Sequence, residues 1–546
     1  MLGACTSPAA PQPQAQTEAP AATEQQAAQP STATTEQATE APAASEPKVG
    51  GRLVIATVAE PLTLDPQKAN GNVVISFLGS SLVAKDKDNN YVPWLAKSWE
   101  ISPDGLVWTF KIRDDVKFWD GSPMVAEDIA YSYKRAMDPE TKSPLTGQML
   151  ATVDTIEAPD ATTLVITLKE PMAPFMDNLA AEGFMTPIKK AAVEEFGENF
   201  GHNLMSVGPY KVKEWVTGDH ITLERNPDYV WQPAYAHQGP YYIEEIVFRF
   251  IPEISTTVAG LEAGELDYTY TFEPQYIPRI EETGKFNILS TSLTGASPYV
   301  SINVSKPPFD DLKVRQAINY AINRQDLIDV IQKGNATIQY GPISPSVIGY
   351  WPGVEEIGYD NNPEKAKELL AEAGWVDTNG DGIVEKDGKP FKLSFPVVSA
   401  VIKDAQMIQE QVKAVGIELT VEQGELATVI GKIVGGESEI GILGGYNWPN
   451  YDILWLVYHS KQEGALNLDH VNDPELDKLL DAMRTETDPV KRQEVIDQAQ
   501  KRIVEQAYLI PLYTPQSLLP LSKKVQGAYQ SQKNNLLYLE DAWIEE

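Results

Sequence analysis

The sequence contains a single cysteine, Cys5, and only five histidines among its 546 residues. One cysteine excludes a disulfide within the chain, and it leaves the histidines without the thiolate partners of most structural zinc sites. The sequence has no His-Glu-x-x-His motif, no Gly-x-Ser-x-Gly nucleophile motif and no phosphate-binding P-loop. We therefore predict no catalytic residue, no metal site and no cofactor.

Basic residues are also scarce. The 44 lysines and arginines are outnumbered by 77 aspartates and glutamates, which gives a formal net charge of −33. Nucleic acids and anionic membrane surfaces both require a basic contact surface, so the charge balance argues against either as the main partner. The sequence has no run of 18 or more apolar residues and predicts no membrane-spanning helix.

What the chain does contain is typical of a globular protein of two or three domains. Hydrophobic residues make up 42% of it and aromatic residues 9%. Expected strands, such as 52–56, alternate with expected helices, such as 308–324 and 363–373, and this order predicts an α/β architecture. Arg315 and Arg324 in the first of these helices are predicted to form ion pairs of the scaffold.

The N-terminal part has a different composition. Residues 1–5, Met-Leu-Gly-Ala-Cys, resemble the end of a bacterial lipobox, whose cysteine is lipidated. A secretory signal needs basic and apolar segments before its cleavage site, so we expect a late start site or a trimmed signal. Residues 6–48 are mostly Ala, Pro, Gln, Thr, Ser and Glu, which predicts a disordered linker. We expect lipidated Cys5 to anchor a globular body to the cell membrane through this linker.

Several different short motifs are spread along the predicted globular part. They are Pro-Leu-Thr-Leu-Asp-Pro at 61–66, Tyr-Val-Pro-Trp-Leu-Ala at 91–96, Pro-Asp-Gly at 103–105, Asp-Gly-Ser-Pro at 120–123, Gly-Pro-Tyr at 208–210 and Asn-Pro-Asp-Tyr at 226–229. In this order and spacing they resemble family 5 of the extracytoplasmic solute-binding proteins, the oligopeptide and dipeptide receptors of ABC importers.

The resemblance implies a periplasmic-binding-protein-like type II fold, with two lobes joined by a hinge and an extra subdomain. Lobe I is expected over 49–83, 201–295 and 515–546, the extra subdomain over 84–200, and lobe II over 296–514. Such a receptor closes its lobes around a solute and delivers it to membrane permease subunits, without performing chemistry. We expect a monomer outside the cytoplasm, at the cell surface or in the periplasm.

Segment 444–455, Gly-Gly-Tyr-Asn-Trp-Pro-Asn-Tyr-Asp-Ile-Leu-Trp, combines aromatic rings with amides and a carboxylate. This composition suits a ligand crevice, although a half-buried edge strand that runs into a core helix explains it as well. The resemblance places the segment on the ligand-facing side of lobe II. The ligand-binding candidates are Tyr446, Trp448, Asn450, Tyr451 and Asp452 in lobe II, Asn70, Gly71 and Asn72 in lobe I, and Ser297 and Tyr299 just past the hinge.

The identity of the ligand depends on two positions. Peptide-binding members pair the peptide ammonium with an aspartate where this chain has Asn450, and Asp452 lies two residues further on. A peptide is the first hypothesis, and it depends on Asp452 turning toward the ligand. An oligosaccharide stacked on Tyr446 and Trp448 is the second hypothesis, and a nickel chelate is the third. A surface-anchored hydrolase is the alternative from a different functional class.

Residues 377–382, Asp-Thr-Asn-Gly-Asp-Gly, begin like a calcium-binding loop. The twelfth position, where a bidentate glutamate is expected, holds Gly388, while Glu385 occupies the ninth. We therefore predict a β-turn between strands rather than a metal site.

Overall fold

The computed structural model describes residues 46–69, 72–86, 89–292, 295–446, 448, 450–531 and 535–545, without the side chains of residues 296, 297, 443, 444 and 446. Cys5 and most of the expected linker lie outside the described residues, so lipidation and linker disorder stay predictions. The chain divides before Pro47, and the account below concerns Pro47–Glu546. None of the described helices is long and apolar enough to cross a membrane.

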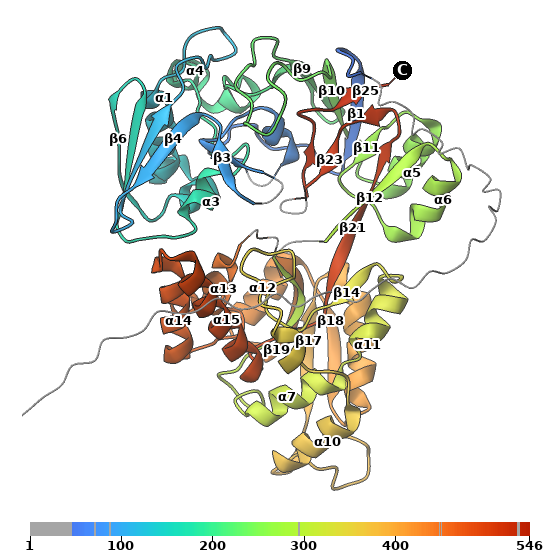
Figure 1. The fold of residues 1–546 in the computed structure, drawn as a ribbon. Helices are drawn as coiled ribbons and strands as arrows, with labels where there is room; N and C mark the ends of the chain where they lie inside the picture. Colours follow the sequence, from blue (N-terminus) through green and yellow to red (C-terminus); the bar gives the residue numbers. More distant parts are fainter. Residues whose placement is uncertain are drawn as a thin grey trace, which may run out of the picture. The chain divides into compact units, whose positions relative to one another are not determined.

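The largest sheet has the strand order β12-β21-β11-β1-β10-β9-β8, with β14 paired to β21 (Figure 1). Its central strand β1 buries Leu53 and Ile55 completely and pairs in parallel with β10 and β11. Except for β14, the strands come from the ranges expected for lobe I or begin within two residues of them. The bounds are β1 Arg52–Thr57, β8 Tyr210–Val216, β9 His220–Arg225, β10 Glu245–Phe250, β11 Tyr268–Thr269, β12 Phe286–Ser292, β14 Ala336–Ile338 and β21 Tyr513–Ser522.

A second, antiparallel sheet has the order β4-β5-β7-β6 and lies wholly within the range expected for the extra subdomain. The predicted Pro-Asp-Gly turn connects its first two strands, and Gly105 there has a φ of 73°, which glycine adopts without strain. The bounds are β4 Ala96–Ile101, β5 Val107–Ile112, β6 Val153–Asp160 and β7 Thr163–Leu168, with the pair β2 Val83–Lys85 and β3 Tyr91–Pro93 beside them in sequence. The helices of this range are α1 Ala126–Met137, α2 Thr146–Met149, α3 Phe175–Leu179 and α4 Lys190–Phe196.

A third sheet has the order β18-β17-β19-β13-β20, all from the range expected for lobe II. Strand β19 therefore lies inside the sheet between β17 and β13, not at its edge, and α13 follows it. The strands are β13 Ala296–Ile302, β17 Lys392–Val397, β18 Glu418–Gln423, β19 Ile440–Tyr446 and β20 Ile510–Pro511. The helices are α7 Leu312–Ala321, α8 Arg324–Asp326, α9 Val354–Ile357, α10 Pro363–Glu372, α11 Ile402–Lys413, α12 Leu426–Val434, α13 Asp452–Tyr458, α14 Pro474–Thr485 and α15 Pro489–Glu505.

Small elements complete the described chain. The helices α5 and α6 belong to the range of lobe I, and Gly264 ends α5 with a φ of 80°, which suits a glycine C-cap. The bounds are α5 Ile254–Ala263, α6 Ile277–Glu282, β15 Glu385–Lys386, β16 Lys389–Pro390, β22 Val525–Gln526, β23 Tyr529–Gln530, β24 Leu537–Tyr538 and β25 Trp543–Ile544. The chain passes between the largest and the third sheet where β12 leads to β13 and where β20 leads to β21, the two places where the expected ranges of lobe I and lobe II meet. The domain boundaries themselves stay a prediction.

The two arginines of the 308–324 segment are part of the scaffold, as expected, but within the described part of the chain they bond to backbone carbonyls and not to carboxylates. Arg315 donates to the carbonyls of Phe309 and Gln506 at 2.7 and 3.0 Å. Arg324 is buried and donates to the carbonyls of Pro511 and Tyr359 at 2.6 and 2.8 Å. Backbone carbonyls thus take the place of the carboxylates that the sequence led us to expect, because the chain wraps closely around both guanidinium groups.

Candidate ligand-binding site

A cavity of about 810 Å³ lies where three parts of the chain meet. Its wall includes residues 57–63, from the end of β1 onward, segment 180–184 after α3, and Trp448 and Asn450 after β19. Small-molecule sites typically enclose about 300–1,000 Å³. The cavity therefore has the size of a ligand site and draws its wall from all three ranges predicted as lobes and subdomain.

Asn72 lies in the cavity wall, and its side chain also holds the local backbone. Its Oδ1 accepts the Ile75 N–H at 3.2 Å, which caps the short 3₁₀ helix Val73–Phe77, and its Nδ2 donates to the Thr63 carbonyl at 3.2 Å. These bonds fix the loop after β1 against the start of that helix. The neighbouring candidates Asn70 and Gly71 lie outside the described residues.

Asp65, from the Thr-Leu-Asp-Pro motif, has a structural role. It is buried and receives two hydrogen bonds from Arg135 of α1, at 3.0 and 2.6 Å. A bidentate contact of this kind is among the stronger side-chain interactions. The motif thus ties the loop after β1 to helix α1 and gives the cavity a fixed wall.

Asn450 lies in the cavity wall, and its side chain connects two parts of that wall. It is 2% exposed, and its Nδ2 donates to Asp177 Oδ2 at 2.8 Å, while its Oδ1 accepts the Asp452 N–H at 2.9 Å. Asp177 belongs to α3, so this bond joins the ranges predicted as lobe II and extra subdomain. Trp448 is half-buried and lies in the same wall.

The Asp177 carboxylate has two further partners. Tyr91 donates its hydroxyl at 2.7 Å, and Lys85 forms an ion pair with the same carboxylate. Burial and the negative charge of Asp177 raise the pKa of the Tyr91 hydroxyl, so tyrosine stays protonated and remains a donor. Asp177 and Lys85 both line the cavity. The wall beside Asn450 therefore carries a carboxylate, although position 450 itself is an amide.

Asp452 is engaged elsewhere in this structure. Its carboxylate is 6% exposed and receives two hydrogen bonds from Arg484 of α14, at 2.6 and 2.8 Å. Arg484 in turn stacks on Trp455, with 3.6 Å between its guanidinium carbon and the ring centroid. As far as the described residues define it, the cavity wall does not include Asp452, Tyr451 or Tyr299, which are all buried. The side chains of Ser297 and Tyr446 are not described, and the ligand roles of all these candidates stay predictions.

Several residues of the wall had not been singled out from the sequence. Asp177, Lys85, Glu182 and Tyr538 place charged or phenolic groups on the cavity. None stands in a motif, because each reaches the cavity only through tertiary packing. The one local signal is Gly183, which has a φ of 80° and whose Cβ would meet the Ile75 backbone at 2.8 Å. A glycine is therefore required beside Glu182.

Comparison with known proteins identifies the family. The model of "Bacterial extracellular solute-binding proteins, family 5 Middle" matches residues 90–465. The chain belongs to this family. Family 5 proteins are solute receptors of ABC importers that act outside the cytoplasm, and the predicted periplasmic-binding-protein-like type II fold is confirmed.

Similar family 5 proteins cover nearly the whole chain. The oligopeptide-binding protein AppA of Bacillus subtilis (strain 168) is 27% identical over 517 residues, covering 92% of this chain and 93% of AppA. The glutathione-binding protein GsiB of Pectobacterium atrosepticum is 30% identical over 506 residues, covering 90% and 94%. The solved structure of DppA from Helicobacter pylori, in complex with the peptide STSA, has a TM-score of 0.73 at 27% identity, covering 90% and 99%.

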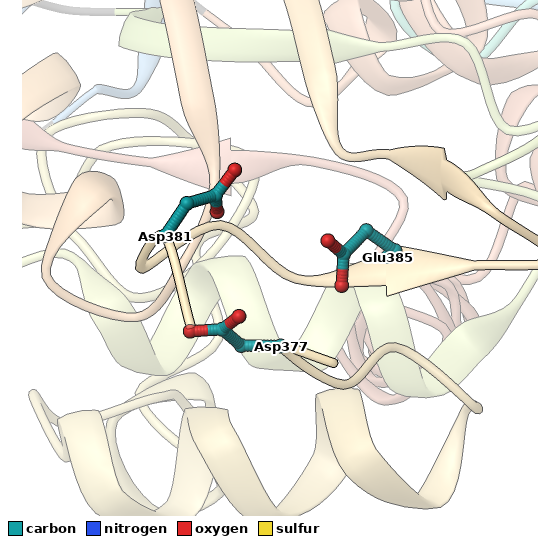
Figure 2. Close-up of side chains that lie close together, drawn as sticks. All are labelled: Asp377, Asp381 and Glu385. Carbon is teal, nitrogen blue, oxygen red and sulfur yellow. The ribbon is translucent and has the colours of Figure 1, made fainter. Parts of the chain in front are cut away.

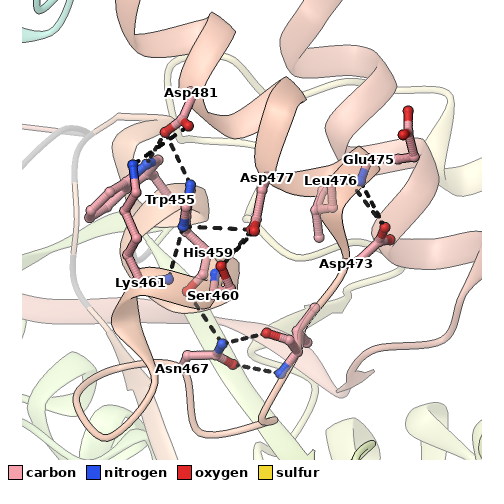
Figure 3. Close-up of polar contacts among 11 residues, drawn as sticks. Trp455, His459, Ser460, Lys461, Asn467, Asp473, Glu475, Leu476, Asp477 and Asp481 are labelled. Carbon is pink, nitrogen blue, oxygen red and sulfur yellow. Dashed lines mark hydrogen bonds and ion pairs between the residues drawn. The ribbon is translucent and has the colours of Figure 1, made fainter.

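A histidine-centred cluster lies at the C-terminal end of α13 in this family 5 protein (Figure 3). His459 is buried, with its Nε2 3.0 Å from Asp481 Oδ1, and its Nδ1 accepts the Lys461 N–H at 3.0 Å. Ser460 donates its hydroxyl to Asp477 at 2.5 Å. An activated serine nucleophile instead shares its proton with a base such as histidine. The cluster has the geometry of a helix support and adds nothing to the hydrolase alternative.

Asp377, Asp381 and Glu385 are the residues of the described chain whose carboxylates could jointly hold a metal ion, since their oxygens lie within 4.8 Å of one another (Figure 2). Asp377 already accepts the N–H groups of Gly380 and Gly382 at 2.7 and 3.0 Å. The antiparallel bridge between Val376 and Glu385 closes this loop. The loop is not part of the described cavity wall.

Proposed function

We propose that this family 5 receptor binds short peptides in the described cavity and delivers them to the permease subunits of an ABC importer. The names of the relatives AppA and GsiB refer to an oligopeptide and to glutathione, a tripeptide, which supports a peptide ligand. The observation that carries the proposal is the Asp177 carboxylate, which stands in the cavity wall in contact with Asn450.

Asn450 stands where peptide-binding family members have the aspartate that pairs with the peptide ammonium. The Asp177 carboxylate in the same cavity wall can take over this role. A hydrogen bond to a charged group contributes roughly 1.5–3 kcal/mol, and a buried ammonium without one is unfavourable by more. Both carboxylates are paired, Asp452 with Arg484 and Asp177 with Lys85, but of these two only Asp177 lines the described cavity. On this proposal the ammonium of the peptide takes the place of Lys85 at the Asp177 carboxylate, and Asn450 keeps its hydrogen bond to that carboxylate.

The test begins with the ligand itself. Mass spectrometry of material released from the purified protein by denaturation is expected to identify peptides. Calorimetry with a tetrapeptide pool and with its N-acetylated counterpart then measures how much the free ammonium contributes to the binding free energy. Asp177→Asn is expected to lower the affinity for free peptides roughly tenfold, the equivalent of about 1.4 kcal/mol. Asp154→Asn, an exposed change on β6, serves as the matched control.

The remaining ligand hypotheses give different outcomes. Trp448, half-buried in the wall, suits stacking of a sugar face, and an uncharged oligosaccharide would leave Asp177 without a cationic partner. Binding of β-linked oligosaccharides in place of peptides would replace the proposal by this second hypothesis. Binding of a nickel–histidine chelate alone would replace it by the third. Turnover of any of these compounds would show the hydrolase alternative to be right.

We propose further that the protein is monomeric and is held at the cell membrane by lipidated Cys5. The lipobox-like residues before Cys5 and the linker composition after it support this anchoring. Cys5→Ala is expected to move the protein from the membrane fraction to the soluble fraction without changing its affinity for ligand. Retention of the variant in the membrane fraction would contradict lipidation, and light scattering checks the monomer.

A further inference from the structure

Lys68 is a basic residue of the cavity wall whose charge is held only loosely by the rest of the chain. Within the described residues it forms one ion pair, with Glu198 at 3.6 Å. The side chain of Lys68 is 35% exposed and that of Glu198 is 95% exposed, and Glu198 is not part of the described wall. Exposed ion pairs contribute little, because water and salt screen them. An anionic group of a ligand can therefore replace Glu198 as the partner of Lys68.

Lys85 is the other basic residue of the wall, as far as the described residues define it, and it is held more tightly. Its ammonium forms an ion pair with Asp177, and the two side chains are 14% and 7% exposed. The ammonium also lies over the ring of Tyr91, 5.1 Å from the ring centroid. Charges attract each other more strongly where less water surrounds them. Of the two cations, Lys68 is thus the one that is open to an anion in the ligand-free receptor.

The backbone that carries Lys68 is fixed. The N–H groups of Lys68 and Ala69 both donate to the Asp65 carbonyl, at 3.0 and 2.8 Å. The Asp65 side chain is held in turn by the bidentate contact with Arg135 of α1. The turn therefore presents the Lys68 side chain from a backbone that is already ordered, and a preorganised site loses less entropy when a ligand binds.

Thr63 adds a hydroxyl donor to the same segment of the wall. Its carbonyl accepts Asn72 Nδ2 at 3.2 Å, and its Oγ1 accepts the Asp65 N–H at 3.1 Å. The hydroxyl proton donates to no acceptor among the described residues. A carboxylate accepts hydrogen bonds at both of its oxygens, and an ammonium together with a hydroxyl supplies donors for both.

We propose that Lys68, together with the Thr63 hydroxyl, forms a subsite for a carboxylate of the ligand. The inference rests on the proposed peptide function and adds to it the anionic group that the peptide presents, either its C-terminal carboxylate or an acidic side chain. The subsite differs from the proposed ammonium site, whose carboxylate is Asp177 on α3. A peptide bound at both places carries a positive and a negative group, so the cavity selects against peptides that lack one of them.

The test uses tetra-alanine as the free acid and as the C-terminal amide, and tetra-alanine amides in which one position at a time is glutamate or glutamine. Calorimetry on the full chain is expected to show roughly tenfold tighter binding of one carboxylate than of its amide, about 1.4 kcal/mol. Preference for the free acid identifies the C-terminal carboxylate, and preference for glutamate at one position identifies an acidic side chain. In Lys68→Met the preferred carboxylate is expected to lose its advantage.

Three further variants separate the charge of Lys68 from its ion pair. Glu198→Gln removes the partner and keeps the cation, so the preference for the carboxylate is expected to persist or to increase. Lys501→Met removes an equally loose ion pair, with Glu505 at 3.7 Å, outside the described wall, and is expected to leave the preference unchanged. Thr63→Val is expected to reduce the preference by less than Lys68→Met does, and an unchanged preference there would overturn the role of the hydroxyl.

Three results would overturn the subsite. Equal affinities for every carboxylate and its amide in the wild type would do so and leave the proposed peptide function intact. A preference that persists in Lys68→Met but disappears in Lys85→Met would assign the carboxylate to Lys85, which the peptide ammonium releases from Asp177 in the proposed function. If no peptide of either series binds, the proposed function fails and the subsite with it.

Discussion

Asp452 and Arg484 form a buried bidentate pair directly behind the cavity wall, and the pair fixes the first turn of α13. Removing one partner of such a pair leaves the other charge buried without compensation. We expect Asp452→Asn to lower the free energy of unfolding by about 3 kcal/mol, measured by urea denaturation. At a temperature where the variant is folded, its peptide affinity is expected to stay within a factor of about two, below 1 kcal/mol.

An exposed ion pair provides the control for this change. Glu368, which contacts Lys365 on the surface of α10, is expected to tolerate Glu368→Gln with a loss below about 1 kcal/mol. A large loss of peptide affinity in Asp452→Asn at nearly unchanged stability would contradict our assignment. It would show that Asp452 leaves Arg484 and turns to the ligand.

Glu540 makes the stability of the receptor depend on pH. Its pKa of about 8 in the folded protein lies above the ordinary value of 4.5. The unfolded chain therefore loses this proton at lower pH than the folded one. Stability from this group is fully present below the ordinary pKa and is lost as the pH rises to about 8, by about 1.4 kcal/mol per pH unit at most.

Replacing the carboxyl by an amide removes that dependence. Glu540→Gln and the wild type are expected to have similar unfolding free energies at pH 5. At pH 8.5 the variant is expected to be more stable by an amount on the order of a few kcal/mol. Denaturation at both pH values measures the difference, and Glu198→Gln, with its side chain 95% exposed, is expected to show none. A difference that does not change with pH would contradict the burial of an acid at position 540.

At the scale of single elements, helix α7 begins at Leu312, four residues inside the expected range 308–324, directly after Asp311. Asp311 accepts the Lys313 N–H at 2.9 Å and so caps the helix, whose residues Val314, Ala317 and Ile318 are buried. Asp311→Ala is expected to lower the free energy of unfolding by about 1 kcal/mol through the lost cap. The exposed neighbour supplies the comparison, since Asp310→Ala is expected to change stability by less than about 0.5 kcal/mol. Equal losses in the two variants would show that the cap contributes nothing.

Elements of this kind could be predicted from the sequence because their signals are local. The helix expected over 363–373 is α10, which Asn362 caps by accepting the Lys365 N–H at 3.0 Å, with Pro363 in its first turn. The residues of the candidate site could be predicted less completely from the sequence. Trp448 and Asn450 were found because they lie in a composition that suits a crevice, but Asp177 and Glu182 belong to unremarkable sequence. Their role depends on packing between distant segments, which local periodicity does not contain.

At the scale of the whole molecule, the pairing of strands that are distant in the sequence is a constraint that no single element contains. Its largest sheet joins strands from near the beginning, the middle and the end of the described chain, as the pairing of β1 with β10 and of β12 with β21 shows. Propensity predicts that such strands exist but not which of them are neighbours, since pairing is set by packing over long sequence distances. The lobe ranges could therefore be predicted only through the motifs that resemble the family, and they stay a prediction.

Because the cavity wall comes from segments 57–63 and 180–184 together with Trp448 and Asn450, a ligand that fills it must restrain all three regions at once. A ligand closes a receptor only when it binds the closed state better than the open one. With the tetrapeptide that most raises the melting temperature, we expect slower amide hydrogen exchange in 57–63, 180–184 and 450–452. The hairpin of β15 and β16, outside the described wall, is expected to exchange unchanged. Protection confined to one of the three segments would mean that the ligand does not bridge them, and binding would then proceed without closure.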